Sequence, residues 1–92
     1  MNIETFLEEK SIEDVVNTRL SNRELEVLRK LAQGYDVAEM AKNLKISRNT
    51  VKVYLSNLSQ KISIPTTNTN FRVAMCIFYS RFKKDLEQWK KK

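Results

Sequence analysis

The segment 46–62 carries, along one side, the kinds of side chain that contact nucleic acid. In a helix its outward face would be formed by Arg48, Asn49, Lys52, Val53, Ser56 and Gln60. Cationic and hydroxyl groups contact phosphate oxygens, whereas amides, hydroxyls and small aliphatic groups contact base edges in the major groove. The face has no acidic residue, which would repel phosphate. Its composition therefore indicates a DNA-reading surface, and the alternative is an ordinary solvated helix face.

Four apolar residues define the opposite side of the same helix. They are spaced by four, three and four residues, which at 3.6 residues per turn makes one stripe that must pack on a core. The four are Val51, Leu55, Leu58 and Ile62. The pattern predicts a recognition helix over residues 47–62, with its polar side turned to solvent.

Three capping signals place the start of this helix and of two helices before it. Each has a serine or aspartate at the N-cap and a side chain three residues later that can return a hydrogen bond. The pairs are Ser21 with Glu24, Asp36 with Glu39, and Ser47 with Thr50. They predict helices that begin near residues 22, 37 and 48. A similar pair, Ser11 with Asp14, predicts one or two short helices in the first 19 residues.

Short connections join the three main helices. Gly34 falls where the first of them ends, at the left-handed position that favours a residue without a Cβ atom. Between the second and third helices only Lys45 and Ile46 precede the Ser47 cap, and the small Ala41 lets the two backbones approach. Such a connection is typical of a helix-turn-helix, in which the second helix of the pair enters the DNA groove.

Residues 20–64 resemble the LuxR/GerE-type helix-turn-helix domain of many bacterial response regulators and quorum-sensing activators. Four motifs carry the resemblance: a Leu-Ser-x-Arg-Glu opening, a glycine after the first helix, a Glu-Met-Ala core and an Ile-Ser-x-x-Thr-Val-Lys signature. They begin at Leu20, Gly34, Glu39 and Ile46. The resemblance implies an all-α, four-helix domain. With only 19 residues before the domain, the chain is similar to the stand-alone members, which lack a receiver or ligand-binding module.

The resemblance also implies roles for individual residues. Lys52 and Val53 would look into the major groove. Ser47, Thr50 and Lys61 would lie near the sugar-phosphate backbone. The complete candidate DNA-binding set is Ser47, Arg48, Asn49, Thr50, Lys52, Val53, Tyr54, Ser56, Asn57, Gln60 and Lys61.

This chain departs from the family pattern at three positions. Tyr54 stands where the family often has histidine. Ser56 stands where the family frequently has a basic residue, so the base preference is expected to differ and the affinity to be lower. Lys45 stands where a turn glycine is common. If Lys45 is left-handed, the strain costs on the order of 1 kcal/mol.

The net charge of +6 is unevenly spread along the chain. Residues 1–19 carry −3, residues 20–64 carry +4 and residues 65–92 carry +5. The positive part coincides with the helix-turn-helix and the segment after it, as expected for a nucleic-acid binder. We therefore divide the chain into an acidic N-terminal helical extension, 1–19, and a helix-turn-helix domain, 20–92, that includes a C-terminal dimerisation helix.

Several other classes of protein are disfavoured. The chain has no histidine and one cysteine, so neither a zinc site nor a Cys/His nucleophile is expected, and Cys76 is predicted to be a core side chain. One glycine is too few for a phosphate-binding loop. We expect no cofactor and no enzymatic activity. No apolar stretch reaches the length of a membrane span and the start is acidic, which favours the cytoplasm over a membrane or export.

The apolar residues after Pro65 predict a fourth, continuous helix over residues 71–89, about 30 Å long. Their spacing is close to a heptad: Phe71, Met75, Phe78, Phe82, Leu86 and Trp89. A helix that runs to Trp89 would overhang a three-helix core. We therefore expect a homodimer through Phe78, Phe82, Leu86 and Trp89. The alternative is that the overhang packs on the apolar residues of the N-terminal segment, which are Ile3, Phe6, Leu7, Ile12, Val15 and Val16.

Two functions from different classes fit these observations. The first is a sequence-specific regulator of transcription that binds double-stranded DNA. The second is a protein-interaction module, an antiactivator that binds RNA polymerase or another regulator without touching DNA. A protein-docking face is expected to be more apolar and less cationic than the outward face of 48–60. The sequence favours the first.

Overall fold

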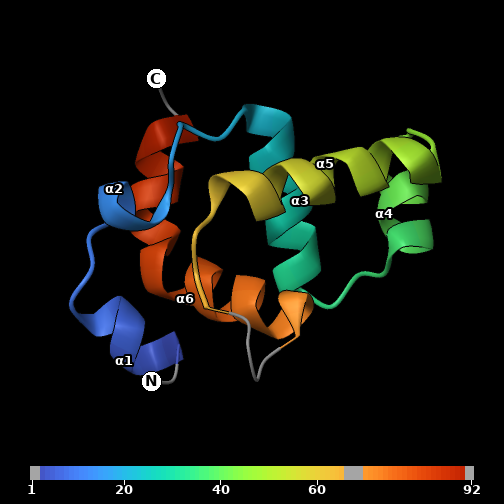
Figure 1. Ribbon diagram of the computed structural model, residues 1–92. Helices are drawn as coiled ribbons and strands as arrows, with labels where there is room; N and C mark the ends of the chain where they lie inside the picture. Colours follow the sequence, from blue (N-terminus) through green and yellow to red (C-terminus); the bar gives the residue numbers. More distant parts are fainter. Residues whose placement is uncertain (1–2, 66–69, 91–92) are drawn as a thin grey trace.

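The computed structural model describes residues 3–65 and 70–90, and this part of the chain is built from six helices (Figure 1). They are α1 (Ile3–Glu8), α2 (Ile12–Val15), α3 (Asn22–Ala32), α4 (Val37–Leu44), α5 (Arg48–Lys61) and α6 (Phe71–Lys90). Within the described residues, the only β-type pairing is one isolated antiparallel bridge. The all-α class, the two short N-terminal helices and the long last helix are as the sequence predicts.

The capping residues start the helices where the sequence predicts. Ser21 and Asp36 both form complete capping boxes with the glutamates three positions later. The Ser47 side chain accepts a hydrogen bond from the Thr50 N–H group, and its hydroxyl lies 2.8 Å from the Thr50 hydroxyl. A threonine hydroxyl is too short to reach back to the N-cap N–H as glutamate does. The start of α5 is therefore capped from one direction only.

The two turns of the helix-turn-helix use left-handed backbone. Gly34 follows the end of α3 with a φ of 97°, and Lys45 follows α4 with a φ of 59°. The N–H group of Ile46 then bonds to the carbonyl of Ala41 at 3.0 Å, which closes the turn before α5. The prediction for Gly34 is confirmed, and Lys45 holds the conformation in which a side chain costs strain.

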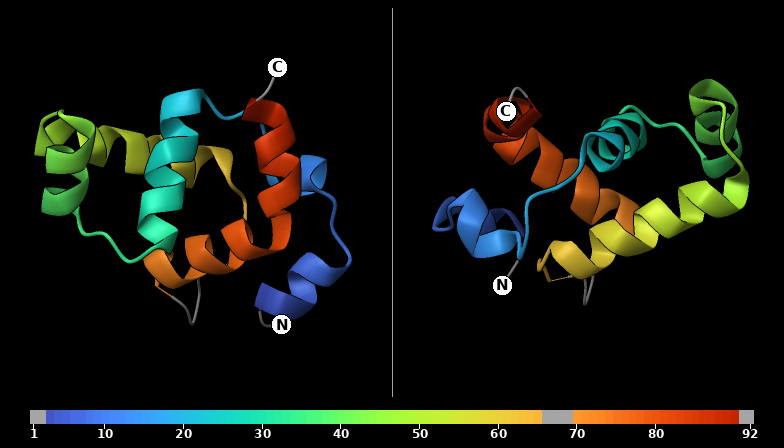
Figure 2. Two further views of the ribbon diagram at one scale, coloured as in Figure 1. Left: turned by 180° about the vertical axis from the view of Figure 1, so that it is seen from behind. Right: turned by 90° about the horizontal axis from the view of Figure 1, so that it is seen from above.

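Helix α3 lies at the centre of the molecule, with α5 across one side and α6 along another (Figures 1 and 2). Its residues Val27 and Leu28 are fully buried. The guanidinium of Arg72, in α6, donates hydrogen bonds to the carbonyls of Leu31 at 3.1 Å and Tyr35 at 2.8 Å. These bonds satisfy carbonyls at the end of α3 and tie the turn before α4 to α6.

The last helix is long, as predicted, but the expectation that its second half overhangs the core is wrong. At Phe82 the backbone leaves helical geometry (φ −112°, ψ 19°), and the second half of α6 turns back along α3 (Figure 1). An ion pair of 2.8 Å between Arg29 and Glu87 holds this second half in place. The pKa of Arg29 lies above its ordinary value, because a hydrogen bond with Tyr79 and the charge of Glu87 outweigh the cost of burial.

The apolar seam of α6 is covered within one chain. Phe78, Phe82 and Leu86 are 0%, 1% and 2% exposed, and they share one core with Ile3 and Leu7 of α1. Helix α1 packs along α6 (Figure 2). The expectation that the seam needs a second copy for burial is therefore not met, because the N-terminal segment supplies the cover.

Trp89 lies at the far end of this seam. Its ring is partly buried against the core, and the guanidinium carbon of Arg19 stands 5.6 Å from the ring centroid. Both ends of the described N-terminal segment, residues 3–19, are thus in contact with α6.

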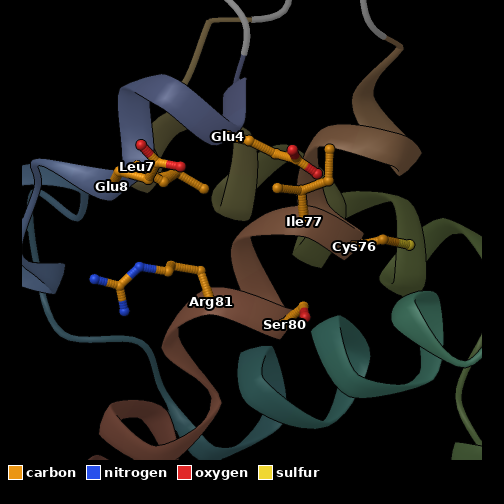
Figure 3. A pocket seen from close by; sticks show the side chains of 7 residues that line it. All are labelled: Glu4, Leu7, Glu8, Cys76, Ile77, Ser80 and Arg81. Atoms are coloured by element: carbon orange, nitrogen blue, oxygen red, sulfur yellow. The ribbon is translucent and has the colours of Figure 1, made fainter.

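Helix α1 does not lie flush on α6. A groove of about 540 Å³ opens between them (Figure 3). Glu4 and Glu8 of α1 form one wall, and Ile77 and Arg81 of α6 form the other. Cys76 also lines the groove. Its side chain is only partly buried, so the prediction that Cys76 is a core side chain is met only in part. The groove is therefore lined by charged groups of both signs.

Candidate nucleic-acid interface

The inner side of α5 is locked into the core. Val51 and Leu58 are fully buried and face α3 and α4, while Leu55 and Tyr54 are partly buried beside them. Ile62 is buried as well, although it is the residue that follows the helix. The predicted stripe is confirmed, so the rotation of α5 about its own axis is fixed.

The outer side of α5 is open to solvent. All six residues that the sequence assigns to the outward face are exposed, and Val53, at 56%, is one of the two exposed large apolar side chains among the described residues. The six are Arg48, Asn49, Lys52, Val53, Ser56 and Gln60. Within the described residues, neither Arg48 nor Lys52 takes part in an ion pair. Both cations are therefore available to an external anion.

The start of α5 adds backbone groups to this surface. Ser47 is exposed and Thr50 is half-buried; their hydroxyls bond to each other, and the Ser47 hydroxyl accepts a hydrogen bond from the Thr50 N–H group. The N-terminus of a helix presents free N–H groups and the positive end of the helix dipole, which attract phosphate. Arg48 and Asn49, the first two residues of α5, lie at this end.

Three further candidate DNA-binding residues are partly buried and do not belong to the exposed face. Tyr54 and Asn57 are half-buried, with Tyr54 packed against the core. The ammonium of Lys61 is 2.7 Å from a carboxylate oxygen of Glu24, in the first turn of α3. A phosphate contact by Lys61 would have to compete with this ion pair.

Glu24 is the buried member of the pair. Its side chain is 5% exposed, and the same Oε1 atom accepts a hydrogen bond of 2.8 Å from the N–H group of Ser21. Burial raises the pKa of Glu24, but the hydrogen bonds from Lys61 and Ser21 outweigh it, so the pKa lies below its ordinary value. The sequence identifies Glu24 as a capping residue and gives no sign of its contact with α5, 37 residues later.

The N-terminal segment reaches the other end of α5. Residues 15–17 run antiparallel to residues 61–63, and Asn17 bonds to the carbonyls of Gln60 and Lys61. Acidic residues of this segment, Glu13 and Asp14, are exposed. In the view from above, α4 lies at one end of α5 while α1 and α2 lie at the other (Figure 2). Exposed cations therefore lie at the start and middle of α5, and two exposed carboxylates belong to the segment that meets its end.

Other kinds of site find no support in the described part of the chain. It contains no cluster of three or more cysteine, aspartate or glutamate side chains suited to hold a metal ion. None of its helices is both long and apolar enough to cross a membrane. The exposed cationic face of α5 remains the strongest candidate site.

Comparison with known families agrees with this geometry. Residues 18–74 match the bacterial regulatory proteins of the luxR family, and the match contains α3, α4, α5 and the start of α6. The chain belongs to the luxR family. It is thus a helix-turn-helix domain of a non-enzymatic family of DNA-binding transcription regulators.

Individual relatives lie among response regulators and operon regulators of this family. A nitrate/nitrite response regulator homologue of Haemophilus influenzae is 36% identical over 77 residues, which is 84% of this chain and 35% of the relative. The nitrate/nitrite response regulator NarP of Escherichia coli is 43% identical over 60 residues, 65% of this chain and 26% of NarP. The CsgBAC operon regulator of Escherichia coli is 49% identical over 45 residues, 49% of this chain and 21% of that regulator.

The chain spans about a third or less of the length of these relatives. No solved structure matches the chain. The similarity therefore extends to the helix-turn-helix region and part of its surroundings.

Proposed function

We propose that the protein reads DNA sequence by placing α5 in the major groove. One observation carries this proposal: the inner side of α5 is fixed by buried Val51 and Leu58, while its outer side is exposed, cationic and free of acids. A helix of this kind fits the width of the major groove and can present its side chains to base edges.

The residues divide by chemistry into two groups. Lys52 and Val53 lie at the middle of the exposed face, where a cation can bond to guanine and an aliphatic group can contact the thymine methyl group. Asn49, Ser56 and Gln60 add amide and hydroxyl groups on the same side. These five are assigned to base edges.

The second group lies at the helix start and the flanks. Ser47, Arg48 and Thr50 surround the N-terminus of α5, where phosphate is favoured. Tyr54, Asn57 and Lys61 lie toward the core side of the helix and are assigned to the sugar-phosphate backbone at the edge of the contact.

The homodimer remains part of the proposal, on a different surface from the predicted seam. Because Phe78, Phe82 and Leu86 are buried within one chain, a second copy would meet the outside of α6, where Val73 is 43% exposed. A two-fold protein suits a palindromic site, in which the half-site spacing reports the distance between the two recognition helices. Sedimentation of the purified protein over a range of concentrations, alone and with DNA, measures the assembly, and a single monomeric mass throughout both series would exclude the dimer.

Selection of duplexes from a random library by the purified protein tests DNA reading. We expect an enriched motif, with affinity that falls with salt by about 0.9 log units per log unit for each phosphate contact. Lys52→Ala and Val53→Ala should reduce the preference for the enriched motif over a scrambled duplex by about 5- to 100-fold. Arg48→Ala should weaken both duplexes alike and lower the salt slope by about 1.

The matched control for the cations is Lys83→Ala, an exposed lysine on α6 away from α5. It should leave the preference for the motif unchanged. Failure of the wild-type protein to bind any duplex in dilute buffer would contradict DNA reading, and would favour the protein-interaction module that binds RNA polymerase or another regulator.

A further inference from the structure

The end of α5 is capped by a residue that lies far away in the sequence. The last four carbonyls of a helix have no N–H partner within the regular helix pattern. In α3 and α4 a left-handed residue, Gly34 or Lys45, closes the end, but α5 runs directly into extended backbone at Ile62. The open carbonyls of α5 need donors from another part of the chain.

Asn17 supplies two of these donors. Its backbone N–H group bonds to the carbonyl of Lys61 at 2.8 Å, and its side-chain Nδ2 bonds to the carbonyl of Gln60 at 3.3 Å. Asn17 is exposed, so its amide is held by these bonds and not by burial. One residue of the N-terminal segment thereby holds the last turn of α5 at two points.

Further contacts on either side of Asn17 hold the N-terminal segment against the end of α5. The N–H group of Ser63 bonds to the carbonyl of Val15 at 2.8 Å, and Val16 lies opposite Ile62 in the antiparallel bridge. Val15, Val16 and Ile62 are all buried. The segment itself is anchored on α6 through Ile3 and Leu7 of α1, so it gives α5 a fixed support.

We propose that Asn17 is a positioning residue of the recognition helix: it touches no DNA, and it sets the direction of α5 through the carbonyls of Gln60 and Lys61. This inference rests on the proposed reading of DNA by α5. It assigns the acidic N-terminal segment, which repels phosphate, to the DNA-reading unit as its support.

The direction of α5 matters because a shift of its last turn moves base-contacting residues along the helix. Its 14 residues span about 21 Å, and the residues assigned to base edges extend from Asn49 in the first turn to Gln60 in the last. Hydrogen bonds to base edges tolerate only a few tenths of an ångström, whereas long cationic side chains follow a phosphate over a wider range. Release of the last turn should therefore weaken base reading more than phosphate binding.

The test measures selectivity in variants of the full chain. The probes are a duplex enriched by the wild-type protein and a scrambled duplex of equal length. Asn17→Ala should lower the ratio of the two affinities about two- to tenfold, the size expected for one net hydrogen bond, with an unchanged salt slope. Asn17→Gln, which keeps the amide donor at an exposed position, should restore most of the ratio.

Asn17→Asp separates the donor from the shape, since a carboxylate has the same outline and cannot donate. Its matched control is Thr18→Asp, which adds the same charge at the next exposed residue. The added charge should weaken both duplexes in both variants, and only Asn17→Asp should lower the ratio. Circular dichroism and thermal denaturation confirm that each variant is folded at the assay temperature.

Two results would overturn the inference and leave DNA reading intact. In the first, Asn17→Ala and Asn17→Asp keep the wild-type ratio of affinities for the enriched and the scrambled duplex, while Lys52→Ala lowers this ratio. The other is an equal loss for both duplexes in Asn17→Ala, which is the result of mere destabilisation. Absence of wild-type binding to either duplex would overturn DNA reading and, with it, the role of Asn17.

Discussion

The Nζ atom of Lys61 lies 2.7 Å from the Oε1 atom of Glu24, and so the last residue of α5 is joined to the first turn of α3. The same oxygen accepts the N–H group of Ser21. One carboxylate therefore closes a capping box and anchors the recognition helix. Because Glu24 is buried, removal of its cation would leave an uncompensated charge.

Glu24→Gln should lower the free energy of unfolding by about 1–3 kcal/mol at neutral pH, through loss of the ion pair and weakening of the cap. The pKa of Glu24 is lowered in the folded state, so its stabilisation is complete above the ordinary value of 4.5 and is lost as the pH falls below it. The difference between wild type and variant should shrink in that acid range. Urea denaturation at a series of pH values measures it.

The control for this prediction is Glu26→Gln. Glu26 pairs with Arg23 on the surface, where both side chains are well exposed, so we expect a change of less than about 0.5 kcal/mol. A Glu24→Gln difference that stays constant from neutral pH into the acid range would contradict the assignment of the stabilisation to the ionised carboxylate.

Lys45→Gly should raise the free energy of unfolding by about 0.5–1 kcal/mol. At a φ of 59° the Cβ atom of Lys45 crowds the backbone, and glycine removes this strain against the cost of a more flexible unfolded chain. The matched control, Lys42→Gly in the interior of α4, should lower the free energy of unfolding by about 1 kcal/mol. Thermal denaturation of the two variants distinguishes them, and a loss in both would show that the turn is not strained.

Arg72→Lys should lower the free energy of unfolding by about 1–2 kcal/mol. The guanidinium bridges the carbonyls of Leu31 and Tyr35 with two nitrogens, which one ammonium group cannot reproduce. Arg81→Lys, at an exposed position on the same helix, is the control and should be neutral. Equal stability of both variants in urea would mean that the bridge contributes nothing.

Phe82→Leu should lower the stability of the single chain by about 1–2 kcal/mol, because Phe82 packs against Phe78 in the core with ring centroids 5.3 Å apart. The loss should not depend on protein concentration, since the seam is covered by α1. Denaturation at two concentrations a hundredfold apart measures this. If only the dilute sample lost stability, the seam would belong to an interface between copies.

Local patterns predict most of the helix-turn-helix. Capping pairs such as Asp36 with Glu39 act over three residues, and the stripe that contains Val51 and Leu58 follows from the helical period. Both signals depend only on residues that lie close together in the sequence. The starts of α3, α4 and α5 and the exposed face of α5 could therefore be predicted.

Contacts between distant segments could not be predicted in the same way. The sequence shows apolar residues in α1 and in α6 but does not say whether one chain or two bring them together. The kink at Phe82 brings the second half of α6 back onto its own chain, and neither glycine nor proline marks that position in the sequence. The contacts of Asn17 and Glu24 with the end of α5 depend on the same packing, and no local signal points to them.

The packing of α1 on α6 has a consequence for biosynthesis. A ribosome adds about 5–20 residues per second, so Leu7 emerges several seconds before Phe82 is made. During that interval the first helix has no surface on which to bury Ile3 and Leu7, whereas α3, α4 and α5 can already meet one another. The residues of α1 thus leave the ribosome before the residues on which they pack, and Ile3 and Leu7 stay exposed until α6 has been made.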